Sequence, residues 1–98
     1  MERRLVWNKR PATVLRKALK RISEDSYSQA ERVEAVILKN LNQARNNPEQ
    51  YPPDKFKKEN SGHFRAFETH SYRVAYRYNE NEVRVLRIRH IKQEPKSY

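Results

Sequence analysis

Apolar and polar residues alternate along the last third of the chain, from Phe64 to Tyr98. A period of two is typical of strands that bury one face and expose the other, and here it predicts three consecutive strands, with turns near residues 69–71 and 79–82. In the middle strand, large apolar side chains share one phase: Tyr72, Val74, Tyr76 and Tyr78. The other phase holds Arg73, Ala75 and Arg77. We therefore expect a sheet with one packed face and one cationic, open face.

The first half of the chain follows a helical period instead. After a short strand-like run at Arg4–Trp7, apolar residues recur at helical spacing in two segments. The first segment contains Val14, Leu15, Ala18, Leu19 and Ile22, with Pro11 in its first turn. The second contains Ala30, Val33, Ile37, Leu41 and Ala44. Ser28 and Glu31 fit a capping box that would start the second helix, and Pro48 ends it.

Residues 49–63 form a loop rich in proline and charge, which is more often functional than idle in so small a domain. The element order is thus β-α-α-β-β-β. It predicts a single α+β domain over residues 1–98, with a twisted, mainly antiparallel sheet and two N-terminal helices packed on one of its faces.

Composition narrows the functional classes. The 98 residues contain no cysteine, which excludes disulfides and thiolate metal sites, and we expect neither a metal nor a cofactor. No apolar run reaches the ~20 residues that span a bilayer, so we expect a soluble, cytoplasmic protein that does not associate with a membrane. The net charge of +10 favours a polyanionic or acidic partner: nucleic acid, an acidic membrane surface or an acidic protein.

The segment SYRVAYRY followed by VRVLRIRHIKQEPKSY resembles the RelE/ParE superfamily of bacterial toxins, the toxic halves of type II toxin–antitoxin pairs. The match includes Tyr72-Arg73-Val74-Ala75-Tyr76, and the layout of the N-terminal half agrees. For RelE-like members the resemblance implies a metal-independent endoribonuclease that cleaves mRNA on the ribosome and inhibits translation. It also implies an acidic antitoxin protein as partner.

In that scheme the resemblance assigns catalysis to three residues. Arg73 would stabilise the scissile phosphate, since its planar fork binds two oxygens. His90 would transfer a proton, because its pKa lies near neutrality. Tyr98 would orient a base or support the leaving group. Further contacts to the substrate would come from Arg65, Lys92, Asp54 and Arg77, with Asp54 in the loop where some members hold a carboxylate base. We expect Arg65 on the face opposite the helices, together with Arg73 and the C-terminal cluster.

Other interpretations remain open. The strand Phe64–Glu68 carries one cation where RelE-type ribonucleases rely on lysines, and the ending HIKQEP resembles ParE-like members, which inhibit DNA gyrase and lack ribonuclease activity. A non-toxic nucleic-acid-binding or protein-binding relative is a third possibility, because the fold does not determine the chemistry. Arg73 and Arg77 would then be a solvated strand face, and His90 a polar residue at a strand end.

Overall fold

The computed structural model describes residues 2–98 and confirms the predicted α+β class and element order. Its elements are β1 (Arg4–Trp7), α1 (Lys9–Asp25), α2 (Tyr27–Asn46), the 3-10 turn η1 (Pro48–Gln50), β2 (Phe64–Thr69), β3 (Tyr72–Tyr78) and β4 (Glu82–His90). None of the helices within residues 2–98 is both long and apolar enough to cross a membrane.

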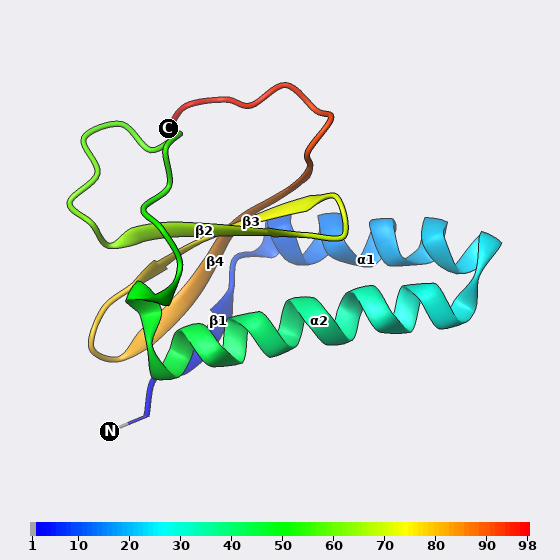
Figure 1. The fold of residues 1–98 in the computed structure, drawn as a ribbon, viewed down its shortest axis with the longest axis horizontal. Helices are drawn as coiled ribbons and strands as arrows, with labels where there is room; N and C mark the ends of the chain where they lie inside the picture. Colours follow the sequence, from blue (N-terminus) through cyan, green and yellow to red (C-terminus); the bar gives the residue numbers. More distant parts are fainter. Residues whose placement is uncertain (1) are drawn as a thin grey trace.

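The four strands form one sheet in the order β1-β4-β3-β2. β1 runs parallel to β4, and the other two pairs are antiparallel. Both helices pack on the same side of this sheet, which we call the helix face, and the opposite side is the distal face (Figure 1). The core between the helices and the sheet includes Leu15, Val33, Ile37, Leu41, Phe67, Val74, Tyr76, Val83, Val85 and Ile88.

A single extended residue, Ser26, separates the two helices. Its backbone N–H donates to the carbonyl of Ile22, which ends α1, and its hydroxyl accepts from the N–H of Gln29 at 3.2 Å, which caps α2. The predicted capping box at Ser28 and Glu31 is therefore wrong. Ser26 takes the cap position because its extended backbone both ends one helix and begins the next.

The two faces predicted for β3 are confirmed, but burial does not alternate along it, because Ala75 on the second face is buried as well. Val74 and Tyr76 are fully buried against the helices, whereas Arg77 is exposed. The Tyr76 hydroxyl keeps a partner in this core by donating to the carbonyl of Pro48 at 2.6 Å. The hydrogen bond anchors η1, and with it the start of the long loop, because a buried hydroxyl without a partner would be costly.

A β-bulge shifts the phase of β4. Ala75 pairs with Arg87 but Tyr76 pairs with Val85, so Leu86 is an extra residue opposite this step. Before the bulge Val83 and Val85 face the helices, and after it Ile88 does. This irregularity explains why apolar residues of β4 occur in both phases of the sequence.

The distal face is covered in part by two segments. The loop at residues 51–63 pairs with the edge of β2, where the N–H of Asp54 donates to the carbonyl of Phe64 at 2.8 Å. The C-terminal segment then returns to this loop (Figure 1), where the Tyr98 N–H donates to the Phe56 carbonyl at 3.0 Å. The Lys58 N–H donates to the Tyr98 carbonyl oxygen at 2.6 Å. The face expected to be open is therefore partly closed.

Candidate functional site

The distal face carries a cluster of arginine side chains centred on one buried carboxylate, Asp54. Arg73 places Nη2 at 2.7 Å from Asp54 Oδ1 and Nη1 at 3.1 Å from Glu68 Oε2. Asp54 is only 3% exposed, whereas the Glu68 side chain is about half exposed. The Arg73 side chain itself is 12% exposed, so both ends of this guanidinium are held and little of it reaches solvent.

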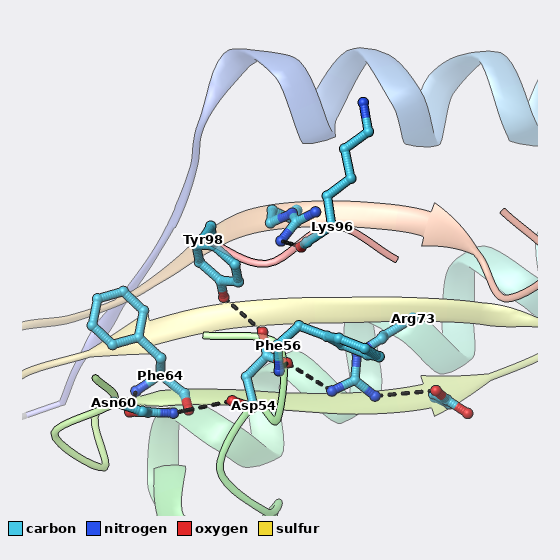
Figure 2. Close-up of polar contacts among 9 residues, drawn as sticks. Asp54, Phe56, Asn60, Phe64, Arg73, Lys96 and Tyr98 are labelled. Carbon is cyan, nitrogen blue, oxygen red and sulfur yellow. Dashed lines mark hydrogen bonds and ion pairs between the residues drawn. The ribbon is translucent and has the colours of Figure 1, made fainter. Parts of the chain in front are cut away.

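Tyr98 completes the cluster from the other end of the chain. Its hydroxyl donates to Asp54 Oδ2 at 2.7 Å, so that Asp54 receives Arg73 on one oxygen and Tyr98 on the other (Figure 2). The Tyr98 ring also packs edge-on against Phe64, with centroids 6.2 Å apart. Three residues from distant parts of the sequence therefore meet through two short, charge-assisted hydrogen bonds.

Two further arginines surround these residues. The Arg87 guanidinium lies 4.4 Å from the centroid of the Tyr98 ring, and it donates to the carbonyl of Lys96 at 2.7 Å. Phe56 lies near both Arg73 and Arg89, whose Cζ atoms are 4.9 and 5.2 Å from its centroid. Aromatic faces attract these cations, so the two rings bridge charges that would otherwise repel one another.

The loop that supplies Asp54 is fixed by Asn60. Its side-chain amide donates to the carbonyls of Asp54 and Phe64 at 3.3 and 2.8 Å. Its side-chain oxygen accepts from the N–H groups of Gly62 and Phe64. One side chain thus ties the loop to the start of β2, and this contact holds Asp54 in position beneath Arg73.

The cluster sets the charge states of its two acids. Burial alone would raise the pKa of Asp54, but hydrogen bonds from Arg73, Tyr98 and the Phe56 N–H outweigh it, so the pKa lies below its ordinary value. Burial raises the pKa of Tyr98, and the hydrogen bond to the Asp54 carboxylate raises it further. Asp54 is therefore ionised and Tyr98 protonated around neutral pH.

Little space remains inside the cluster. The cavity between the loop and the arginines is about 10 Å³ and is lined by Asp54, Phe56, Arg73, Ala75, Arg87 and Arg89. That volume is at the lower limit for one water molecule. A phosphodiester therefore does not fit into the space between Asp54 and the arginines.

His90 lies on the other side of the sheet from this cluster. It pairs in register with Tyr72, whereas Arg73 pairs with Arg89, and adjacent residues of a strand point to opposite faces. Its ring contacts that of Tyr72 edge-on, with centroids 5.3 Å apart, beside α1. The structure therefore brings together two of the three residues predicted to be catalytic, Arg73 and Tyr98, and separates His90 from them.

The expected position of Arg65 on the distal face is wrong. Arg65 pairs in register with the buried Tyr76, and directly paired residues share a face. Its guanidinium donates to the carbonyl of Tyr51 at 3.0 Å and lies 3.7 Å from Glu49. The phase of β2 is set by Phe67, which enters the core, so Arg65 is directed to the helix face and η1.

The other two predicted cations lie outside the cluster. Arg77 shares the distal face with Arg73 and is 3.9 Å from Glu82, at the far end of the strand. Lys92 is exposed in the segment after β4, where its backbone N–H donates to His90 Nδ1 at 3.1 Å. Neither lines the cavity described above.

Sequence reasoning missed Phe56, Arg87 and Arg89. The two arginines alternate with Ile88, which is a strand signal, but assigning them to the distal face requires knowing that Leu86 is the bulged residue. Phe56 lies in a loop without periodicity, so no sequence pattern indicates that its ring would sit between two guanidinium groups.

This fold, with a basic distal face and a basic C-terminal segment, is that of a RelE/ParE-type toxin. Residues 5–95 match the family model described as ParE toxin of type II toxin-antitoxin system, parDE. The chain therefore belongs to this family of type II toxin–antitoxin toxins. None of the curated proteins matches the sequence. Membership implies an antitoxin protein as partner.

Proposed function

We propose that this toxin acts by binding and inhibiting its target, as ParE-like members inhibit DNA gyrase, and that it does not cut RNA. The observation that carries the proposal is the separation of His90 from Arg73 on opposite faces of the sheet. Cleavage at a ribose needs a group that removes the proton of the 2′-OH and another that protonates the 5′-oxygen, both within reach of the phosphate. The imidazole of His90, expected to transfer a proton, lies on the helix face and is therefore directed away from Arg73.

The state of the remaining groups supports the same proposal. The lowered pKa of Asp54 makes it a weak base, and its two oxygens already accept hydrogen bonds from Arg73 and Tyr98. The raised pKa of Tyr98 makes its phenol a weak acid. With about 10 Å³ of space between them, these residues resemble a structural clamp more than a prepared catalytic site. The name of the matching family favours the ParE-like activity as well.

The test compares the two activities on one preparation. Purified protein is added to a DNA gyrase supercoiling assay and, in parallel, to a translation extract in which mRNA ends are mapped. We expect supercoiling to be inhibited, transcripts to remain intact, and growth to stop when the protein is expressed without antitoxin. Cleaved mRNA with unaffected supercoiling would refute the proposal, and normal growth would favour a non-toxic binding relative.

The second candidate is the ribosome-dependent endoribonuclease, because Asp54, Arg73 and Tyr98 do converge on the distal face. The Asp54 carboxylate would take the proton of the 2′-OH as the 2′-oxygen attacks phosphorus. The bond from phosphorus to the 5′-oxygen would break, and Tyr98 would give its proton to that oxygen, leaving a 2′,3′-cyclic phosphate. Arg73 would stabilise the charge that develops on the phosphate.

Two variants separate this candidate from the scheme that relies on His90. If Tyr98 is the acid, Tyr98→Phe abolishes mRNA cleavage and His90→Ala leaves it unchanged. If His90 is the acid, the pattern is reversed. Undiminished cleavage by both His90→Ala and Arg73→Ala would remove both schemes.

A further inference from the structure

His90 lines a groove on the helix face, between α1 and the ends of β3 and β4. The volume of the groove is about 210 Å³, and its lining comprises Val14, Lys17, Ala18, Arg21, Tyr72, His90 and Gln93. No acidic residue is among these. The groove is separate from the arginine cluster, since Tyr72 and His90 face away from Arg73 and Arg89 across the same two strands.

The α1 wall of this groove has two parallel rows. Val14 and Ala18 form an apolar row, and Lys17 and Arg21 form a basic row beside it. Residues four apart are neighbours on a helix surface, so each pair lies one turn apart along the same direction. A ligand that matches this wall carries an apolar row flanked by negative charges at a similar spacing.

His90 adds a donor on the opposite wall. The Lys92 N–H donates to His90 Nδ1 at 3.1 Å, so Nδ1 acts as an acceptor and the neutral ring carries its proton on Nε2. The backbone N–H of His90 is already bonded to the Gln93 side chain at 3.1 Å. These contacts hold the ring against Tyr72 and leave Nε2–H free to donate to an oxygen in the groove.

The cations of this groove are not neutralised within the protein. Over residues 2–98, neither Lys17 nor Arg21 takes part in an ion pair, whereas Arg73 on the distal face has two. Both α1 side chains are exposed. Their charge is therefore available to an outside partner, and an acidic one gains attraction here without first breaking an internal bond.

We propose that this groove is a docking site for an acidic, amphipathic segment of the antitoxin, with its apolar side chains over Val14, Ala18 and Tyr72 and its carboxylates at Lys17, Arg21 and His90. The proposal rests on membership of the toxin–antitoxin family and holds whether the cellular target is gyrase or mRNA. The apolar row favours a peptide over nucleic acid, whose backbone presents phosphates without a matching aliphatic row.

The experiment measures the affinity of toxin variants for the antitoxin and for overlapping synthetic peptides that tile it. The test variant is Lys17→Glu/Arg21→Glu. The matched control is Arg16→Glu/Lys20→Glu, which makes the same charge change on the same helix but lines the other groove, between α1 and α2. We expect the test variant to bind at least about tenfold more weakly, and the control to change affinity by no more than about twofold.

The role of His90 is tested with two substitutions of that residue and with its NMR signal. His90→Ala removes the donor and should weaken binding, while His90→Gln restores an N–H donor and should recover part of the loss. NMR signals of His90 and Tyr72 should shift on addition of the binding peptide. Circular dichroism of each variant establishes that the fold is intact before its affinity is compared.

Three outcomes would overturn the proposal. Equal weakening by the test and control variants would show a general charge effect and no specific groove. An unchanged affinity in the test variant would place the antitoxin elsewhere. Oligo(dT) that shifts the His90 and Tyr72 signals, when none of the antitoxin peptides does, would make the groove a nucleic-acid site. None of these outcomes bears on the gyrase assay, so the two proposals fail separately.

Discussion

The two faces of the sheet use positive charge differently. On the distal face, Arg73 is 12% exposed and held by Asp54 and Glu68, and the cavity beside it measures about 10 Å³. On the helix face, Lys17 and Arg21 are exposed and border a groove of about 210 Å³. The basic residue on the distal face is thus part of the internal structure, whereas those on the helix face are exposed to solvent.

The difference shows that net charge is a poor guide to where a partner binds. A guanidinium that already has buried carboxylate partners contributes to the native state, and a ligand must compete with those partners to reach it. An exposed lysine or arginine without a partner costs the fold little and offers its charge to an incoming ligand. We therefore expect substitutions on the distal face to affect stability, and those in the groove to affect binding.

The largest effect is expected for Asp54→Asn. The substitution leaves Arg73 with a weaker partner inside a nearly closed site, and breaking a buried pair in this way costs about 3–5 kcal/mol. Urea denaturation measures the free energy of unfolding. Glu68→Gln is the matched control, since Glu68 pairs with the same arginine but is half exposed, and its loss should cost less than about 1 kcal/mol. Similar losses of unfolding free energy in both variants would contradict the structural role of the buried Asp54–Arg73 pair.

Tyr98→Phe should have the next largest effect. The ring keeps its contacts with Phe64 and Arg87, and only the hydrogen bond to the Asp54 carboxylate is lost. A bond to a charged group is worth about 1.5–3 kcal/mol, and denaturant unfolding should show that loss. Tyr27→Phe is the control, because Tyr27 is 71% exposed and its change should stay within about 0.5 kcal/mol.

Asp54 and Tyr98 should make the free energy of unfolding depend on pH. The pKa of Asp54 is below 3.8 in the folded protein, so its contribution is present above that pH and is lost as the pH falls through the folded value. The pKa of Tyr98 is above 10.0, so its contribution is present below that pH and is lost as the pH rises further. Burial also raises the pKa of Tyr51 and Tyr76, so Tyr98→Phe should reduce the alkaline loss of stability without abolishing it. The measurement is the change in denaturation midpoint with pH, and an alkaline loss equal to that of the wild type would contradict the prediction.

The smallest effect on stability is expected in the groove. Lys17→Glu/Arg21→Glu alters two exposed side chains without internal ion pairs, so the free energy of unfolding should stay within about 0.5 kcal/mol of the wild-type value. Thermal and urea denaturation of the free toxin provide the measurement. A loss comparable to that of Asp54→Asn would mean that the groove is part of the structural framework, and the contrast between the faces would disappear.

The sequence was sufficient for the element order because its periodicities are strong and local. The pattern of β3 can be recognised from the apolar or polar character of each residue alone, and Val74 and Tyr76 are buried as that pattern requires. The helices follow from apolar residues such as Val33 and Ile37 in the same way. The cap was misplaced because Ser26 and Ser28 have the same chemistry, and only the backbone of the corner decides between them.

The site was harder to predict because it depends on contacts between distant segments. Arg73, Asp54 and Tyr98 were candidates through a family resemblance, but nothing local indicates that one carboxylate would hold both of the other two. Arg65 was placed on the wrong face since the phase of β2 is set by which neighbour enters the core. His90 could not be assigned to a face without the pairing of β4.

The extra residue in β4 determines which face of the sheet receives the imidazole. If Leu86 were paired in regular alternation instead of bulging, every side chain that follows would point to the opposite face, and His90 would then lie on the side of Arg73. The same inversion would expel Ile88 from the core and bury Arg87 in its place, which would be strongly destabilising. Moving the histidine to the distal face by removing the bulge would therefore require a redesigned end of the strand, with an apolar residue at position 87 and a polar one at position 88.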